Sequence, residues 1–470
     1  MVFSSLDFLF VFLPLALTAY YLVPVRFRRL CLLLFSLAFY IYGAWDKPFQ
    51  IVLLLASSVV NWGVGLLLQK TSHRKAVLVS GLLYNFGWLF VFKYADFLFS
   101  SVQAGFDKWW PAAGVTLPQL DWILPLAISF YTFQVASYII DVYRRTIPAE
   151  SSFFKFSSYL CMFPQLISGP LVSYRKLSEQ LERPRLSLSR IDNGIKDFTI
   201  GMGLKVLLAN QIGGLWNDID GIGFDSISTP LAWMGMIAFS LQLYFDFYGY
   251  SLMAIGLGKM LGFRLPDNFR HPYMSLSMTE FWRRWHITLG SWFREYLYIP
   301  LGGNRCSKWR NIFNLLIVWL ATGFWHGASW NFLLWGLVIF CFITLEKYAI
   351  KPTLERFPVL GHTYMFFLIP LTFLIFAISD ISQLGIYLER LFPFLPGGPI
   401  NISPGDYLAH AEQYGWLLAI GLVFSTAWPR RIYNRIKNNL LGTLLLLAVF
   451  WLSVYCLYMG LNDPFMYFRF

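Results

Sequence analysis

The sequence predicts an all-α membrane protein with many transmembrane helices. Of its 470 residues, 57% are hydrophobic and only 13% are charged, whereas a soluble globular protein is about half apolar and a quarter charged. Apolar stretches long enough to cross a hydrocarbon layer of about 30 Å recur along the whole chain. Lipid offers no partner to backbone polar groups, so each stretch is expected to be helical.

The apolar stretches predict transmembrane spans near residues 6–22, 30–45, 49–69, 76–99, 122–140, 193–211, 231–261, 311–325, 330–346, 360–379, 415–427 and 438–460. The first is followed by "PVRFRR" rather than by a small-residue cleavage site, so we expect it to be retained. Basic connectors alternate with neutral or acidic ones, which predicts that both termini lie on the periplasmic side. The basic segment 264–310 is then expected on the cytoplasmic face.

Residues 153–172, "FFKFSSYLCMFPQLISGPLV", do not fit a simple span. The segment is apolar but is interrupted by Pro164, Gly169 and Pro170. Non-helical backbone at membrane depth is tolerated only where protein or a watery cavity covers it. We therefore expect this segment to be re-entrant or interior. No internal repeat or long linker divides the chain, which predicts a single membrane domain over residues 1–470.

The charge balance is basic, with 37 Lys and Arg against 25 Asp and Glu and a net charge of +12. In a membrane protein such an excess indicates cytoplasmic loops rather than a nucleic-acid partner. The same basic face also attracts anionic lipids and phosphate-bearing donors. The five cysteines are scattered without ligand-like spacing, so the sequence indicates neither a disulfide framework nor a metal site.

His326 is the candidate catalytic residue that the sequence singles out first. The apolar run before it, "NIFNLLIVWLATGFW", would span about 22 Å as a helix, which is less than the hydrocarbon thickness. His326 should therefore lie below the far surface, where ionisable groups usually face the bundle interior or a water pathway. Gly323 and Gly327 should allow close backbone approach, and Trp325 and Trp330 should supply walls. The alternative is a neutral imidazole that is hydrogen-bonded across a helix interface.

His286 lies in "SMTEFWRRWHITLGSWFREYLYIPLGGNR", which begins at Ser277. Ser277 and Glu280 have capping-box spacing, and large apolar residues recur at helical period through this stretch. The pattern predicts one amphipathic helix on the basic side, with His286 at the border of its apolar stripe. Taken alone, His286 fits an interfacial packing role better than a catalytic one.

Two histidines in one bundle could serve acyl transfer. A neutral imidazole within hydrogen-bond reach can remove the proton of a hydroxyl group as its oxygen attacks an acyl carbonyl. The chain has no GxSxG, HExxH, phosphate-loop or dinucleotide motif in the context that each requires, so the common soluble chemistries lack support.

At this point the residues resemble a known family. "FWRRWHITLGSWFREYLYIPLGGNR" followed by "ATGFWHGASWNFLLWG" is similar to the membrane-bound O-acyltransferases, and within them to the bacterial alginate O-acetyltransferase branch. The likeness extends to "MVFSS" at the start, to 124–144, to "FPQLISGPL" at 163–171 with Ser168, to 243–263, and to the closing "PFMYFRF". It covers most of the chain.

The resemblance implies that His326 is the essential histidine and His286 the second signature residue of the site. It implies a ring of roughly 11 to 13 transmembrane helices around a thin central region, with short or re-entrant helices. A cytoplasmic funnel would admit an acyl thioester, and an external opening would admit the acceptor. Weaker candidates for donor binding or for shaping the site are Arg283, Arg284, Arg305, Asp246, Tyr250, Trp325 and Ser168. Tyr248 and Leu252 depart from the Ser and Asp expected there, which removes support for roles at those two positions.

The expected function is that of an inner-membrane O-acetyltransferase that delivers an acetyl group outward for O-acetylation of an exported polysaccharide. The donor would be acetyl-CoA or another acyl thioester, with no tightly bound cofactor or metal. A periplasmic acetyltransferase partner and the polysaccharide export machinery are the expected partners. Alginate and cellulose both fit, and the modest length favours cellulose or another exopolysaccharide. The alternatives are D-alanyl transfer from a carrier protein toward teichoic acid and a non-enzymatic transporter, which a deep histidine and a broken helix would also fit.

Overall fold

The computed structural model describes residues 2–111, 114–167, 169–394 and 403–460. Every regular element in these ranges is a helix, which confirms the predicted all-α class. Contacts between residues divide the chain into two compact units. Unit 1 contains residues 7–194 and 257–266 with the first two residues, and unit 2 contains residues 3–6, 195–256 and 267–470. The expectation of one domain over residues 1–470 stays a prediction.

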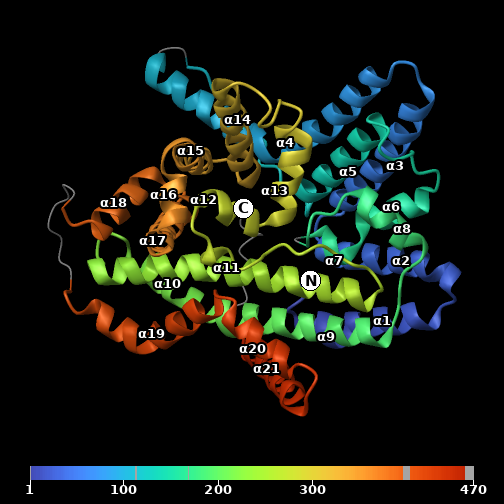
Figure 1. Ribbon diagram of the computed structural model, residues 1–470. Helices are drawn as coiled ribbons and strands as arrows, with labels where there is room; N and C mark the ends of the chain where they lie inside the picture. Colours follow the sequence, from blue (N-terminus) through green and yellow to red (C-terminus); the bar gives the residue numbers. More distant parts are fainter. Residues whose placement is uncertain (1, 112–113, 168, 395–402, 461–470) are drawn as a thin grey trace. The chain divides into compact units, whose positions relative to one another are not determined.

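Unit 1 is built from the N-terminal helices (Figure 1). In chain order they are η1 (Phe8–Phe12), α1 (Leu13–Leu22), α2 (Val25–Gly43), α3 (Phe49–Lys70), α4 (Arg74–Trp109), α5 (Ile128–Tyr143), α6 (Phe153–Cys161), α7 (Phe163–Leu166) and α8 (Tyr174–Glu182). The helix α5 packs against both α3 and α4, and α2 packs against α6. These contacts bury a core rich in aromatic side chains.

The interrupted segment 153–172 is broken and interior, as expected. The Ser152 hydroxyl accepts a hydrogen bond from the Lys155 amide and caps α6, which ends before Met162. The short helix α7 then begins with Pro164 in its first turn. Side chains from Lys155 to Ile167 are buried, and the hydroxyl of Tyr159 donates to the Val172 carbonyl at 2.9 Å. Protein therefore covers the irregular backbone, which is the condition for placing it at membrane depth.

Unit 2 contains the remaining helices, and α9 and α11 each contribute residues to both units. In chain order the helices are α9 (Leu188–Gly203), η3 (Leu204–Ala209), α10 (Asn210–Ile222), α11 (Thr229–Met260), η4 (Pro272–Met274), α12 (Met278–Arg284), α13 (Ile287–Phe293), η5 (Arg294–Tyr298), α14 (Lys308–His326), α15 (Trp330–Leu345), η6 (Glu346–Ile350), α16 (Lys351–Arg356), α17 (Pro358–Ala377), α18 (Ile381–Leu391), α19 (Asp406–Phe424), α20 (Trp428–Ile436) and α21 (Leu440–Tyr458).

The helices α14 and α15 form a tightly packed pair that carries His326 at its turn (Figure 1). A Cβ atom on Gly323 would lie 2.3 Å from the Phe332 carbonyl oxygen, and one on Gly327 would lie 2.1 Å from the Phe332 ring. Only glycine fits at these two positions while the helices keep this spacing. The predicted close backbone approach is thus confirmed at Gly323, whereas the close neighbour of Gly327 is the Phe332 side chain.

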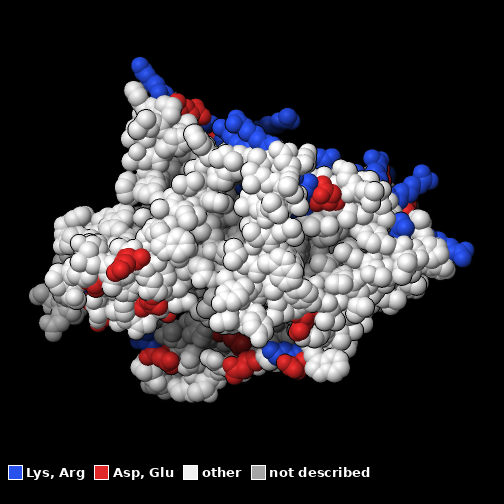
Figure 2. Space-filling model, turned by 90° about the horizontal axis from the view of Figure 1, so that it is seen from below, with Lys and Arg blue, Asp and Glu red and all other residues white. Residues whose placement is uncertain are grey.

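Within the described residues, six helical stretches are long and apolar enough to cross a membrane: Phe49–Lys70, Arg74–Lys93, Leu188–Ile222, Trp330–Arg356, Pro358–Ala377 and Leu440–Tyr458. Uncharged residues cover most of the surface seen in Figure 2, as suits a protein that faces lipid. The chain is therefore a multi-pass membrane protein. The expected total of roughly 11 to 13 spans, the ring and its two funnels stay predictions.

Candidate active site

His326 is the last residue of α14, directly before the turn that leads into α15. It is buried, with 8% of its surface exposed. Three aromatic rings lie nearly perpendicular to its imidazole: the ring centroids of Trp325, Trp335 and Phe376 lie 4.9, 5.3 and 5.1 Å from that of His326. The imidazole therefore sits in an aromatic enclosure formed by α14, α15 and α17.

One wall of this enclosure differs from the sequence prediction. Trp325 is buried, as expected, but Trp330 is 57% exposed. Trp330 is the first residue of α15, and the ring of Trp335, further along the same helix, faces His326 instead. The helical period decides this, because positions five residues apart point in different directions around the helix axis.

The second histidine lies at a break between two short helices. The sequence predicts one continuous amphipathic helix from Ser277, but α12 ends at Arg284 and α13 begins at Ile287. The predicted cap is present, since the Ser277 hydroxyl accepts from the Glu280 amide at 3.2 Å. The prediction of a continuous helix is wrong, because backbone groups at the break form hydrogen bonds with the preceding loop. The Ile287 amide donates to the Asn268 carbonyl at 2.9 Å.

At this break His286 adopts a left-handed backbone conformation, with φ 42° and ψ 51°. Residues other than glycine rarely adopt it, and the strain persists only where surrounding contacts impose it. The main chain on both sides is held, because the Arg270 amide also donates to the Arg284 carbonyl at 2.9 Å. The break therefore fixes the direction in which the His286 imidazole projects.

A buried amide fixes the tautomer of His286. The Oδ1 atom of Asn268 accepts from the Thr288 amide at 3.2 Å and from its hydroxyl at 3.0 Å, so this atom is the carbonyl oxygen of the side chain. The same oxygen lies 3.2 Å from His286 Nδ1. An amide oxygen has no proton to give, so Nδ1 must be the protonated nitrogen. In the neutral ring Nε2 then carries the lone pair.

Burial also determines the charge of His286. Only 4% of its surface is exposed, and desolvation lowers its pKa from 6.5 to about 3. The buried ring has lost contact with water, so its charged form is disfavoured. At neutral pH His286 is therefore an uncharged imidazole with a basic Nε2.

The two histidines approach one another through one tryptophan. The Trp325 ring centroid lies 4.9 Å from that of His326 and 6.1 Å from that of His286. The His286 ring also lies nearly perpendicular to the Phe247 ring of α11, with the centroids 4.6 Å apart. Phe247 of α11, His286 at the break between α12 and α13, and Trp325 and His326 of α14 therefore form a continuous series of ring contacts, and all of them belong to unit 2.

The three arginines proposed for donor binding differ in their surroundings. Arg283 and Arg284 lie in the last turn of α12, directly before the His286 break. Arg284 forms an ion pair with Glu280, as its spacing predicts, whereas Arg283 is exposed. Arg305 is exposed in the turn before α14. Of the two exposed arginines, Arg283 is nearer in sequence to a histidine than Arg305.

Asp246 and Tyr250 lie on α11 and contact other groups than the histidines. Asp246 forms a buried ion pair with Lys205 of η3 at 2.7 Å, and Lys205 also donates to Asn210 at 2.8 Å. The Tyr250 ring stacks on Phe3 with the centroids 4.6 Å apart. Asp246 therefore takes part in a buried ion pair within unit 2.

Some residues escape sequence reasoning. Asn268 gave no signal, because an asparagine in a basic loop fits a turn equally well. Lys205 carried the same signal as Asp246, a charged side chain within an apolar run, and could have been found by this signal.

Ser168 lies outside the described residues, as does the closing "PFMYFRF". In the described part of the chain, no three His, Cys, Asp or Glu side chains are grouped to hold a metal ion.

Comparison with known proteins connects this geometry to a chemistry. Residues 145–388 match the pattern of the membrane-bound O-acyltransferase family, and this region includes both histidines. The chain is 41% identical to a protein named "probable alginate O-acetylase" from Azotobacter vinelandii, over 74% of this chain and 69% of that protein. It is 37% identical to a protein of the same name from Pseudomonas aeruginosa, over 93% and 83% of the two chains. A protein named peptidoglycan O-acetyltransferase, from Helicobacter pylori, is 37% identical over 72% and 69%.

Proposed function

Because the chain belongs to the membrane-bound O-acyltransferase family, we propose that it transfers an acetyl group for O-acetylation of an exported polysaccharide, with His326 as the catalytic base. The family makes the protein an O-acyltransferase, in preference to the transporter alternative. The observation that carries the assignment of the site is the burial of both histidines against Trp325. Alginate and peptidoglycan in the relatives' names support a polysaccharide as the final acceptor, and alginate or cellulose would fit.

In the proposed reaction, His326 takes the proton of an acceptor hydroxyl while the hydroxyl oxygen attacks the carbonyl carbon of the acyl thioester. A carbon–oxygen bond forms and the carbon–sulfur bond breaks. The thiolate leaves with the electron pair of that bond and receives the proton from the His326 imidazolium, which regenerates the neutral base. The aromatic enclosure supports this role, since it excludes water that would otherwise compete as the acceptor.

His286 has a different part in this proposal. With Nδ1–H bonded to Asn268, its Nε2 can accept a hydrogen bond but cannot donate one. We therefore assign His286 to holding the acceptor hydroxyl or a bridging water. The alternative, a hydrogen bond donated to the thioester carbonyl, does not agree with this tautomer. Asn268 acts through His286 and is a positioning residue.

The donor is proposed to be acetyl-CoA or another acyl thioester that arrives from the cytoplasm. Arg283 and Arg305 are exposed, and guanidinium groups attract donor phosphates. The protein is proposed to lie in the bacterial inner membrane with both termini in the periplasm. A periplasmic acetyltransferase partner, together with the synthesis and export machinery, would then receive the acetyl group or present the polymer.

The test measures ester-linked acetate on the exported polysaccharide of cells that carry His326→Ala, His286→Ala or the control His362→Ala. His362 is an exposed histidine in the first turns of α17. Loss of polymer acetylation in the first two variants, at unchanged membrane levels of the protein, supports the proposal. Normal acetylation in His326→Ala would reject His326 as the base. Loss in His362→Ala as well would show that the assay reports folding rather than the site.

A further inference from the structure

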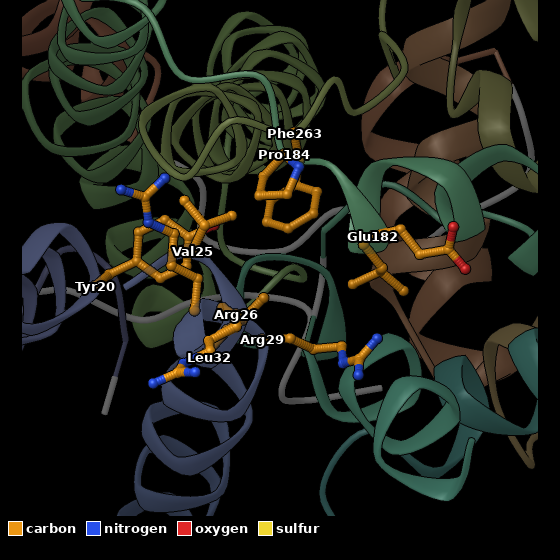
Figure 3. A pocket seen from close by; sticks show the side chains of 10 residues that line it. Tyr20, Val25, Arg26, Arg29, Leu32, Glu182, Pro184 and Phe263 are labelled. Atoms are coloured by element: carbon orange, nitrogen blue, oxygen red, sulfur yellow. The ribbon is translucent and has the colours of Figure 1, made fainter. Parts of the chain in front are cut away.

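We propose that unit 1 carries a binding site for a phosphate ester at the start of α2. The site is a pocket of about 210 Å³, and the side chains around it are shown in Figure 3. Tyr20 of α1, three arginines of α2, Glu182 of α8 and Phe263 line it. We call it the arginine pocket. All its lining residues belong to unit 1, and none is a candidate for the acyl-transfer site.

The arginine pocket has an excess of positive charge. Arg26, Arg28 and Arg29 line it with a single carboxylate, that of Glu182. Glu182 already forms an ion pair with Lys155, and its pKa is lowered first by Lys155 and only to a smaller degree by Arg29. Within the described ranges none of the three guanidinium groups forms an ion pair. An anionic ligand would compensate the excess positive charge of the arginine pocket.

The α2 helix adds to the same excess. It begins at Val25 after Pro24, without a side-chain cap and without an acidic residue in its first turn. Helix amino ends carry partial positive charge, so arginines there are placed against the usual preference for acidic residues. An anion bound at this end would be stabilised by the helix dipole and by the arginines together.

One buried donor in the arginine pocket awaits a partner. The Nε atom of Arg28 is buried and has no hydrogen-bond partner. Its guanidinium lies 5.8 Å from the centre of the Tyr20 ring. The Tyr20 hydroxyl donates to the Leu261 carbonyl at 2.9 Å and is not the partner of this atom. Buried donors are normally satisfied, and the planar fork of an arginine suits the paired oxygens of a phosphate.

The surroundings favour a lipid headgroup as the source of the phosphate. Three apolar side chains next to the arginines are exposed: Leu22 by 79%, Val25 by 61% and Phe27 by 46%. Apolar residues beside basic ones are typical of the membrane interface, where acyl chains cover the former and headgroups meet the latter. An anionic phospholipid would satisfy both at once, whereas a soluble phosphate ester would use only the arginines.

The experiment measures ligand-induced thermal stabilisation of the purified full-length protein in a neutral detergent. The ligands are phosphatidylglycerol, phosphatidylcholine and soluble glycerol phosphate. The variant Arg26→Gln/Arg29→Gln is compared with the wild type and with the control Lys70→Gln/Lys75→Gln. The control removes the same charge from two exposed lysines of unit 1 that do not line the pocket.

We expect phosphatidylglycerol to stabilise the wild type and the lysine control alike. The apparent dissociation constant of the arginine variant should be at least about tenfold higher, because this change corresponds to about 1.4 kcal/mol, which the loss of one charge-assisted hydrogen bond already supplies. If glycerol phosphate acts as strongly as phosphatidylglycerol and also depends on the arginines, the site stands and its ligand is soluble. Equal phosphatidylglycerol binding by the arginine variant and the wild type would overturn the proposal, as would equal stabilisation of the wild type by phosphatidylcholine.

Discussion

Replacing Asn268 by aspartate should raise the pKa of His286 without breaking its contacts. The carboxylate can still accept from the Thr288 amide and hydroxyl and from His286 Nδ1. It also adds a negative charge next to an imidazole that is uncharged in the wild type, since burial lowers its pKa to about 3. An opposite charge at this distance favours the imidazolium.

The size of the shift follows from the geometry. At the 3.2 Å separation of Asn268 Oδ1 and His286 Nδ1, one added charge at an effective dielectric constant of about 20 contributes at most about 5 kcal/mol, or roughly four pKa units. Both charges are spread over several atoms, so we expect about half of this limit or more. The pKa of His286 should thus rise from about 3 to about 5–7.

The assay is nitrogen NMR of protein labelled with ¹⁵N-histidine, which has only six histidines to resolve. His286→Gln identifies the signal of interest. In the wild type we expect Nδ1 to be protonated and Nε2 to be unprotonated throughout pH 5–8. In Asn268→Asp the ring should titrate within or near this range. In Asn268→Ala it should not, although stability should fall by about 1–3 kcal/mol for each donor left unsatisfied. A wild-type ring protonated at Nε2, or an Asp variant that titrates like the wild type, would refute the reasoning.

Three further predictions concern stability in detergent. Lys205→Met should cost about 3–5 kcal/mol by removing the ion-pair partner of the buried Asp246 carboxylate, and adding Asp246→Leu should recover part of the loss in chemical denaturation. Gly323→Ala should lower the melting temperature, because its Cβ would lie 2.3 Å from a backbone oxygen of α15, whereas Gly385→Ala, with no atom within 4 Å, should not. The folded-state pKa of His286 is about 3 and its ordinary value is 6.5. The contribution of the neutral His286 to the free energy of unfolding is therefore complete above pH 6.5. It should be lost on acidification by up to about 1.4 kcal/mol per pH unit, and His286→Gln should remove that part of the slope.

The sequence predicts the helices well because their signal is local. Apolar length located the long helices of the described ranges, and Pro164 with Gly169 and Pro170 marked the interrupted segment that the structure buries. Gly323 and Gly327 indicated the tight helix pair for the same reason, because a residue without a side chain shows directly where another element can pack closely.

The site could be predicted only in part, because its geometry depends on distant residues. The break at His286 comes from backbone bonds to the loop at Asn268, which a helical period does not reveal. Trp335 rather than Trp330 walls His326, because the start of α15 sets the direction of each side chain. The packing of both histidines against Trp325 likewise depends on tertiary contacts, which the local sequence does not reveal.

The central claim is that His326 is the base of acyl transfer, and turnover of radiolabelled acetyl-CoA by the purified protein tests it most directly. Wild type, His326→Ala and the exposed-site control His362→Ala would be compared at equal thermal stability, with the label followed into acetate, partner protein and polysaccharide. We predict that His326→Ala loses about 10²–10⁴-fold in turnover, the usual contribution of a general base, while His362→Ala keeps the wild-type rate. A folded His326→Ala protein that transfers label as fast as the wild type would contradict the account.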